Sequence, residues 1–397
     1  MDTIQAVVSV GEITSAVSTT VSIILWALAL TFLAANLFWA AEMLTLPTRS
    51  STDSIGRYGP DDIQVRVLTI GATDVVQKSV QAMPEELVDR HVIAEKPMDI
   101  DGATVHIVPD SFECEATRKG RALEWARRNV PCEKEYVLYI DEDSIISEVP
   151  EIPDADVIQF SERPTRTGSL FTYLAELFRM GFQLEQRSFS KMSIPLYAWG
   201  GGLAIRKDLE DRVTWNYETI IEDTIFIWAA AQLEDIDFRT VSTKFHNQAP
   251  PTITEMIKQR RRWIGGAVND LDVLPRRYQA LFMIRNFAWS LSPLVLILVV
   301  VPAVTNGPLI NQHYLTVSLI LTAFLYSWSI LGLLYTGESV STSISLLLLT
   351  PFVSLLHSAG ALIGFVSPAQ EFNTTKKIGS SDNSPGVSEK KVDETAD

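Results

Sequence analysis

The sequence predicts an α/β domain carried on transmembrane helices, one N-terminal and about three C-terminal. A mean hydropathy of +0.14 accompanies 20% charged residues in a chain of 397, so apolar and charged residues are segregated along the chain. Long apolar segments lie near both ends. Between them, short β-branched runs alternate with amphipathic stretches, which is the pattern of a layered α/β domain.

The first apolar segment, Val21 to Leu44, contains Glu42 as its single charged residue. At 1.5 Å per residue it is long enough to cross a hydrocarbon core of about 30 Å. No basic residue precedes it and no clear cleavage site follows it, so we interpret it as a retained anchor and not as a signal peptide. Residues 1–46 are therefore predicted to be an N-terminal segment with a transmembrane anchor.

Residues 47–285 are predicted to form the α/β domain. The predicted strands are Gln64–Ile70, His91–Ala94, Val105–Val108, Tyr136–Ile140, Val157–Phe160, Gly202–Ile205 and Asp237–Val241. Helical patterns lie between them, notably Thr117–Arg128, Leu170–Gln186 and Thr224–Leu233.

Residues 286–366 contain three further apolar segments, Phe287–Val304, Tyr314–Tyr335 and Ile344–Val366, each long enough to span a bilayer. Either all three cross, or one is re-entrant or interfacial. The tail, residues 367–397, has few large apolar residues and is predicted to be mostly disordered. Its side of the membrane is left open, because four full spans would place its four lysines outside.

Charge predicts how the chain is oriented. Basic residues are absent before Val21 but crowd the segment before the second span, namely Lys258, Arg260, Arg261, Arg262, Arg276, Arg277 and Arg285. Positive residues stay on the cytosolic side, so the protein is expected to be a multi-pass cell-membrane protein with a cytosolic α/β domain. The net charge of −15 lies mostly in that domain and argues against nucleic-acid binding. Cys114 and Cys132, the two cysteines, suggest neither a disulfide framework nor a zinc site.

The first candidate functional feature is a pair of carboxylates at the end of a buried strand. The apolar run from Tyr136 leads directly into Asp141 and Asp143. Ligands of open α/β sheets bind beyond the carboxyl ends of strands. Oxygen ligands of this kind suit a hard divalent cation, Mg²⁺ or Mn²⁺, that bridges the phosphates of a nucleotide. A solvated acidic turn is the alternative interpretation of this short motif.

The second feature combines a glycine-rich segment with an acidic helix start. Gly200 and Gly201 follow Trp199, and glycines let the backbone approach a ligand closely. Glu222 and Asp223 open a predicted helix, where free amides hold a carboxylate in place. Asp223 is the candidate general base for an attacking hydroxyl. Simple helix capping by acidic residues is the alternative.

The third feature is the segment from Gln259 to Trp263, which ends a helical pattern that begins near Thr252. The Arg262 guanidinium can bind a diphosphate bidentately, and the Trp263 ring is a natural platform for a sugar. Taken alone, this basic cluster before a membrane span is better explained as an ordinary orientation signal.

The order of these features resembles the D-x-D, E-D and Q-x-x-R-W motifs of membrane-bound family 2 glycosyltransferases, which include cellulose and hyaluronan synthases. The closest resemblance is to the egghead-type β-1,4-mannosyltransferases, from about Arg66 to Gly266. It is carried by Ile107-Val-Pro, Arg121-Ala-Leu, Tyr139-Ile-Asp-Glu and Ala249-Pro-Pro-Thr, together with the segment ending at Trp263.

This resemblance implies a GT-A-type, nucleotide-sugar-binding catalytic domain. It places Glu95 where the family usually has a nucleotide-contacting aspartate, and Lys119 where related enzymes have a lysine near the donor. Asp141 and Asp143 would bind the metal and the donor, while Gly200, Gly201, Gln259, Arg262 and Trp263 would contact the acceptor or the diphosphate. The implied catalytic residues are Asp223 and Glu222.

The expected function is inverting, metal-dependent transfer of a sugar from a nucleotide-sugar to a membrane-associated acceptor, expected to be a lipid-linked glycan. The egghead likeness favours GDP-mannose, and UDP-sugars remain open. The alternatives are a processive polysaccharide synthase and a non-catalytic nucleotide-sugar-binding membrane protein. The near absence of ionisable residues in the C-terminal spans argues against a transporter.

Overall fold

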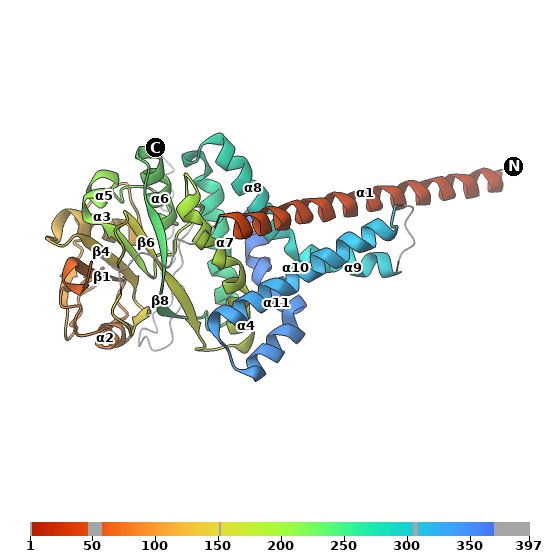
Figure 1. The fold of residues 1–397 in the computed structure, drawn as a ribbon. Helices are drawn as coiled ribbons and strands as arrows, with labels where there is room; N and C mark the ends of the chain where they lie inside the picture. The colour runs from red at the N-terminus through yellow and green to blue at the C-terminus, as the bar shows by residue number, and fades with distance from the viewer. Residues whose placement is uncertain (1, 47–57, 151, 305–308, 369–397) are drawn as a thin grey trace, which may run out of the picture.

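The computed structural model describes residues 2–46, 58–150, 152–304 and 309–368. It places an α/β domain beside a set of apolar helices (Figure 1). Residues 369–397, most of the predicted disordered tail, lie outside the described residues.

The α/β domain is built on an eight-stranded sheet with the order β3-β2-β1-β4-β7-β6-β8-β5. Strands β1 to β4 pair in parallel in the order β3-β2-β1-β4, whereas β7 is antiparallel to both β4 and β6. Because β6 and β8 pair in parallel, the carboxyl ends of β1, β2, β4, β6 and β8 all lie at the same edge. The strands are β1 (Ile63–Thr69), β2 (Arg90–Ala94), β3 (Thr104–Ile107), β4 (Tyr136–Asp141), β5 (Ile145–Ile146), β6 (Val157–Thr165), β7 (Leu203–Arg206) and β8 (Phe238–Gln248).

All seven predicted strands are confirmed, and the two-residue β5 was not predicted. The largest differences are at β6 and β8, which extend beyond their predicted ends to Thr165 and Gln248. These extensions pair with each other past the end of β7. They lack the apolar runs by which the strands were recognised, because their side chains are largely polar.

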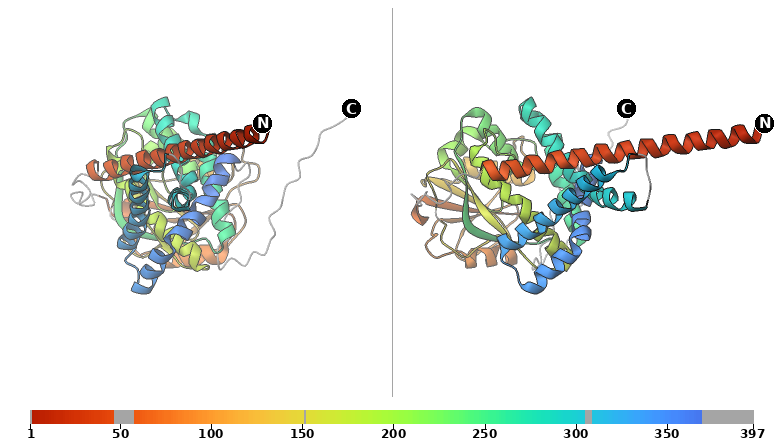
Figure 2. Two further views of the ribbon diagram at one scale, coloured as in Figure 1. Left: turned by 90° about the vertical axis from the view of Figure 1, so that its right-hand side faces the viewer. Right: turned by 45° about the vertical axis from the view of Figure 1, so that its right-hand side comes forward.

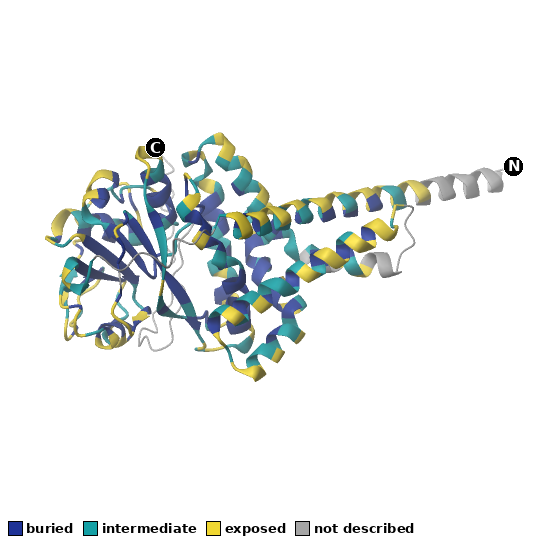
Figure 3. Cartoon of the chain, in the orientation of Figure 1, coloured by how far each residue is buried: buried dark blue, intermediate teal, exposed yellow. Residues whose placement is uncertain are grey.

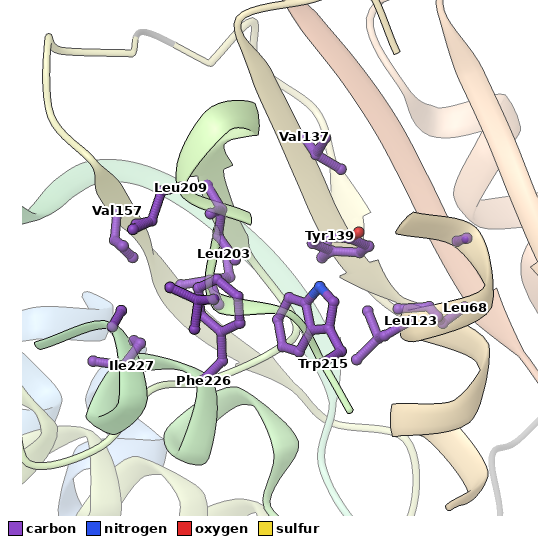
Figure 4. Packing of buried hydrophobic residues seen from close by; sticks show 14 of the residues in the cluster. Leu68, Leu123, Val137, Tyr139, Val157, Leu203, Leu209, Trp215, Phe226 and Ile227 are labelled. Carbon is purple, nitrogen blue, oxygen red and sulfur yellow. The ribbon is translucent and has the colours of Figure 1, made fainter. Parts of the chain in front are cut away.

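Helices cover both faces of the sheet. On one face lie α3 (Arg118–Asn129), α5 (Lys207–Val213) and α6 (Glu222–Leu233), and on the other lies α2 (Thr73–Ala82). Figure 4 shows Phe226 of α6 beside Trp215, with Tyr139 and Leu123 close by. The Trp215 and Phe226 rings are stacked with centroids 4.3 Å apart. Full burial of one such apolar side chain stabilises the fold by roughly 1.5–3 kcal/mol, so this packing fixes the start of α6.

Among the described residues, three helices are long and apolar enough to cross a membrane: Ser15–Thr45, Gln312–Thr336 and Val340–Val366. The first belongs to α1 (Asp2–Thr45), and the others are α10 and α11. Figure 2 shows α1 extending beyond the other helices on the side away from the sheet. Buried residues fill the sheet, whereas α1 and α10 carry many exposed ones (Figure 3). Exposed apolar side chains such as Leu37, Leu319 and Leu348 suit contact with lipid.

The predicted span Phe287–Val304 does not form one long helix. Helix α8 (Arg276–Leu291) ends there, a 3₁₀ turn follows at Ser292–Leu294, and α9 (Val295–Val304) continues for ten residues. Ten helical residues rise only about 15 Å, half of a hydrocarbon core. The break coincides with Pro293, which has no N–H to donate to the preceding turn.

Two helices of the α/β domain pack directly on the long apolar helices: α4 (Leu170–Gln183) on α10, and α7 (Ile253–Asn269) on α11. The backbones of α7 and α11 approach closely at Gly360 and Gly364. A Cβ atom at Gly360 would lie 2.5 Å from the carbonyl oxygen of Ile257, and one at Gly364 would lie 2.6 Å from that of Arg261. The apolar helices therefore set the position of α7, which carries the predicted Q-x-x-R-W motif.

Candidate active site

A cavity of about 710 Å³ opens at the edge of the sheet where the parallel strands end. This volume lies in the range of ordinary ligand sites. Apart from Gly201, every residue predicted for the site lines it: Glu95, Lys119, Asp141, Asp143, Gly200, Glu222, Asp223, Gln259, Arg262 and Trp263. The structure thus brings the predicted residues together, while their individual roles stay predictions.

The carboxylate pair lies at the end of β4. Asp141 is the last residue of this strand, and its side chain is 37% exposed. Asp143 is buried, and its Oδ2 accepts a hydrogen bond from the Gln248 amide at the end of β8, 3.0 Å away. A hydrogen bond from the Ser144 amide to the Asp141 carbonyl closes the turn between strand and loop. The turn is thereby fixed, and Asp141 is the more accessible of the two carboxylates.

Lys119, near the start of α3, lies among three carboxylates. Its Nζ is 2.9 Å from Asp141 Oδ1, 3.4 Å from Glu222 Oε1 and 3.5 Å from Asp223 Oδ2. Burial alone would lower the pKa of Lys119, but the three carboxylates outweigh it and hold that pKa well above its usual value. The ammonium group therefore stays charged and joins β4 to α6 electrostatically.

The backbone just before Lys119 is strained. Arg118 has a φ of +54°, a conformation that non-glycine residues rarely adopt. Arg118 also lines the cavity. Backbone strain of this kind clusters at functional sites.

Asp223 is in the first turn of α6, as predicted, and faces the cavity. Burial raises the pKa of Asp223 from its ordinary 3.8 to about 7, against the opposing effect of Lys119 and with a further contribution from Glu222. A carboxylate with a pKa close to the working pH is well matched to proton transfer. Asp223 is therefore the group in this cavity best suited to act as a general base.

The two glycines of the glycine-rich segment are packed closely against neighbouring side chains. A Cβ atom at Gly200 would lie 2.1 Å from Asp223 Oδ2, so the missing side chain makes room for the Asp223 carboxylate. Gly201 lies against the Trp199 ring, where a Cβ atom would be 2.3 Å from Cζ2. Gly200 thus packs on Asp223 while it lines the cavity, and its contact with a ligand stays a prediction. Sequence spacing could not reveal the packing of Gly200 on Asp223, because the two residues come from different elements.

Arg260, in the basic cluster on α7, has a packing role inside the protein. Arg260 is fully buried and pairs with Glu176 of α4. Its guanidinium carbon lies 4.2 Å from the centroid of the Trp263 ring. Arg262 lines the cavity beside Trp263, within the electrostatic influence of Glu222, Asp141 and Asp223. Arg262 and Trp263 therefore belong to the cavity lining, and Arg260 packs behind Trp263.

Glu95 follows the end of β2 and lines the cavity, as the resemblance implies. Its Oε2 pairs with Arg121 of α3 at 2.7 Å. Burial raises the pKa of Glu95, and Arg121 opposes the shift. The longer glutamate side chain is therefore held at the edge of the cavity by an arginine that belongs to the Arg121-Ala-Leu segment.

Sequence reasoning missed a charged network on α4. Arg179 pairs with Glu162 of β6 and with Glu176, and its guanidinium carbon lies 5.5 Å from the Trp263 ring centroid. Glu176 also binds Arg260, so the network supports the Trp263 ring. A signal for it was present: Glu176, Arg179 and Gln183 are spaced to share one face of an otherwise apolar helix.

Metal binding can be judged from the chemistry of the carboxylates. Within the part of the chain that the structure describes, no group of three or more His, Cys, Asp or Glu side chains is arranged to hold a metal by itself. Mg²⁺ is commonly held by one or two carboxylates and completed by substrate phosphates and water. Asp141 and Asp143 supply oxygen ligands that fit this mode. Cys114 and Cys132 are both free thiols.

The sheet order, with a cavity at the carboxyl ends of the strands and an acidic pair at the end of β4, defines a GT-A-like α/β domain. Residues 136–356 match the family described as Glycosyl transferase family group 2. This match covers more than half of the chain, and the protein belongs to that family. No curated protein sequence matches the chain.

One solved structure supports the fold. The mannosyltransferase PcManGT from Pyrobaculum calidifontis, solved in complex with GDP-Man and Mn²⁺, superimposes with a TM-score of 0.55 at 13% identity. The match covers 87% of this chain and 98% of that one. Glucosyl-3-phosphoglycerate synthase from Mycobacterium tuberculosis, solved with Mn²⁺, UDP and glucosyl-3-phosphoglycerate, gives a TM-score of 0.33 at 15% identity, covering 52% of this chain and 78% of that one.

Proposed function

We propose that this glycosyltransferase is a metal-dependent, inverting hexosyltransferase that uses a nucleotide-sugar donor and a membrane-associated acceptor. The observation that carries the proposal is Asp223, a buried carboxyl with a pKa of about 7 in the same cavity as Asp141 and Asp143. A base near neutrality beside a candidate diphosphate site is the combination that direct sugar transfer requires.

The proposed reaction is a single displacement at the anomeric carbon. Asp223 accepts the proton of the acceptor hydroxyl as its oxygen forms a bond to the anomeric carbon of the donor sugar. The bond from that carbon to the diphosphate oxygen breaks, and the nucleoside diphosphate leaves with the electron pair. Attack opposite the leaving group inverts the configuration. Arg262, which lines the same cavity, would offset the charge that develops on the departing diphosphate.

Asp141 and Asp143 would hold the divalent cation, which when bound supplies Lewis-acid stabilisation of the diphosphate. Lys119 lies 2.9 Å from Asp141 and would hold this carboxylate in place before the donor arrives. Glu95 at the end of β2 would contact the nucleotide, since it lines the same cavity on the β2 side. The resemblance to egghead-type enzymes favours GDP-mannose, and PcManGT, similar in fold, was solved with GDP-Man and Mn²⁺.

The proposed acceptor is a lipid-linked glycan, because the cavity is continuous with residues of α8, including Phe282 and Trp289, beside the apolar helices. We place the α/β domain in the cytosol, where nucleotide-sugars are available, on the strength of the basic residues before the C-terminal helices. Arg276 and Arg277 at the start of α8 fit that orientation.

The test is nucleotide release by the purified full-length protein in detergent. A panel of GDP- and UDP-sugars is supplied with Mg²⁺ or Mn²⁺, and the released nucleoside diphosphate is measured with and without excess EDTA. One donor is expected to be turned over in a metal-dependent way, and Asp223→Asn, tested in parallel, is expected to be inactive. Full activity in EDTA would refute the metal assignment, and no release from any donor would refute the proposed function.

A further inference from the structure

A part of the cavity lining that carries no role in the reaction proposed above is here called the acceptor compartment. We define it by five lining residues: Glu162 of β6, Arg179 of α4, Asn247 of β8, Trp263 of α7 and Trp289 of α8. Trp263 is the residue among them with a role expected from the sequence, contact with the acceptor or the diphosphate. The other four have no part in the donor binding or proton transfer proposed above.

Two of these residues come from the extensions of β6 and β8. The pairing register shifts between Phe160 and Ser161, so Glu162 and Asn247 lie beyond a β-bulge. Bulges are common next to active sites, where they redirect side chains. Asn247 directly precedes Gln248, whose amide binds Asp143. The bulged extension thus places Asn247 next to the carboxylate end of the site.

Two arginines that line the cavity, Arg179 and Arg285, are paired with carboxylates. Arg179 pairs with Glu162 and Glu176. Arg285 of α8, which also lines the cavity, pairs with Glu42 of α1 and with Glu185. Each guanidinium is thus bound by two carboxylates. An anionic head group such as a phosphate would have to displace these carboxylates, so the compartment favours a neutral occupant.

The compartment also contains buried oxygen atoms that lack hydrogen-bond donors among the described residues. Asn247 Nδ2 donates to Glu162 Oε1 at 2.7 Å. The second oxygen of that carboxylate, Glu162 Oε2, and the amide oxygen Asn247 Oδ1 are buried without a hydrogen-bond partner, as is the donor Trp289 Nε1. A buried polar atom without a partner is costly to the fold, so these atoms fit a ligand that supplies several hydroxyl groups.

We propose that Glu162 and Asn247 bind hydroxyl groups of a neutral sugar at the end of the acceptor and thereby select a glycan over a lipid monophosphate. The inference rests on the proposed function and assigns the acceptor class to its site. The Trp263 ring, 5.5 Å from the Arg179 guanidinium that pairs with Glu162, supplies an aromatic surface for the same sugar.

The first experiment compares acceptors with the donor that the full-length protein hydrolyses. A panel of octyl glycosides is tested against citronellyl phosphate, an isoprenoid monophosphate, by released nucleoside diphosphate. At least one glycoside is expected to accelerate release, and the monophosphate is expected to have no effect. Acceleration by the monophosphate and by no glycoside would overturn the proposal.

The second experiment assigns the residues. Asn247→Leu should lower kcat/KM for the glycoside about tenfold to a hundredfold, because a site built to bind a hydroxyl discriminates strongly when the hydrogen bond is lost. Donor KM and hydrolysis of the donor without acceptor should not change. Ser161→Ala is the matched control, since its hydroxyl binds the Val241 carbonyl on β8 and does not line this cavity.

Monodeoxy glycosides distinguish hydroxyl binding by Asn247 from a purely structural role of this residue. In the wild-type protein, removing the hydroxyl bound by Asn247 should lower kcat/KM for the glycoside by the same factor as Asn247→Leu does. In the Asn247→Leu variant, the same deoxy sugar should not lower kcat/KM further. Equal penalties in both proteins would overturn the assignment. Glu162→Gln keeps the side-chain shape. It should likewise reduce the difference in kcat/KM between the glycoside and the analogue that lacks a neighbouring hydroxyl.

Failure of the proposed function is distinguishable from failure of this inference. If no donor is turned over at all, the proposed function fails. Glycoside binding is then followed by quenching of tryptophan fluorescence in the wild-type protein and in Asn247→Leu. Saturable quenching that is weakened at least tenfold in the variant supports the compartment, and identical titrations contradict it.

Discussion

Asp223→Asn separates the contribution of this carboxyl to the reaction from its contribution to folding. Asparagine nearly preserves the shape of aspartate but cannot accept the acceptor proton. General-base assistance is typically worth about 10² to 10⁴ in rate, and turnover should fall by that factor. Nucleotide and metal affinity should stay near the wild-type values, because Asp141 and Asp143 are unchanged.

The same substitution should not destabilise the protein. Burial raises the pKa of Asp223 from 3.8 to about 7. The folded state therefore binds more protons than the unfolded state between these values, and stability falls as pH rises through that window. This difference in pKa corresponds to about 4 kcal/mol, the amount by which ionised Asp223 destabilises the folded state above pH 7. Asparagine removes this cost, while the loss of one carboxylate near Lys119 offsets part of the gain.

The assay combines three measurements on the full-length protein in detergent at pH 8: nucleoside diphosphate release, nucleotide affinity and apparent Tm. We expect Asp223→Asn to lose at least about a hundredfold in kcat, with unchanged nucleotide affinity and an equal or higher Tm. Glu222→Gln is the comparison variant and should lose less activity, since Glu222 contacts Lys119. Near-native turnover of Asp223→Asn, or joint loss of donor binding and transfer, would refute its role as the base.

Four further outcomes follow from the site and the fold. Turnover should fall about tenfold per pH unit below pH 7, because protonation of Asp223 removes the base; a rate independent of pH between 5 and 7 would contradict this. Asp143→Ala should abolish metal-dependent donor binding in a titration with Mn²⁺ and nucleotide, and unchanged affinity would remove Asp143 from the metal site. Trp263→Ala should raise acceptor KM more than donor KM, since an indole face stacks on a sugar but adds little to a diphosphate; the reverse pattern would show that Trp263 serves the donor. Gly360→Ala should lower the apparent Tm by several degrees and reduce turnover, because its Cβ would lie 2.5 Å from the Ile257 carbonyl and push α7 off α11; unchanged melting would refute the close packing.

Apolar periodicity was enough to predict the sheet and most of the helices around the site. The run from Tyr136 to Asp141 is fully buried until its final residue, so the end of β4 and the position of the carboxylate pair could be read from the sequence. The sequence also placed Asp223 correctly at the start of α6, whereas the predicted helix end at Trp263 is wrong, because α7 continues to Asn269. Long apolar stretches predicted α1, α10 and α11 in the same way.

The contacts that define the site could not be predicted in this manner. Gly200 makes room for Asp223, and Arg260 reaches Glu176 across 84 positions of the sequence. Both contacts depend on how separate elements pack, which a linear pattern does not encode. The polar extensions of β6 and β8 were missed for a related reason, because a strand that lines a cavity loses the apolar alternation by which strands are recognised.

The most direct test of the central claim is the stereochemistry of a single transfer. The first product formed from the accepted nucleotide-sugar and a glycoside acceptor is followed by proton NMR of the new anomeric centre before any secondary reaction. Direct displacement assisted by Asp223 predicts a configuration opposite to that of the donor sugar. A product with retained configuration would contradict the account, because a second displacement would then require a nucleophile in the place assigned to the base.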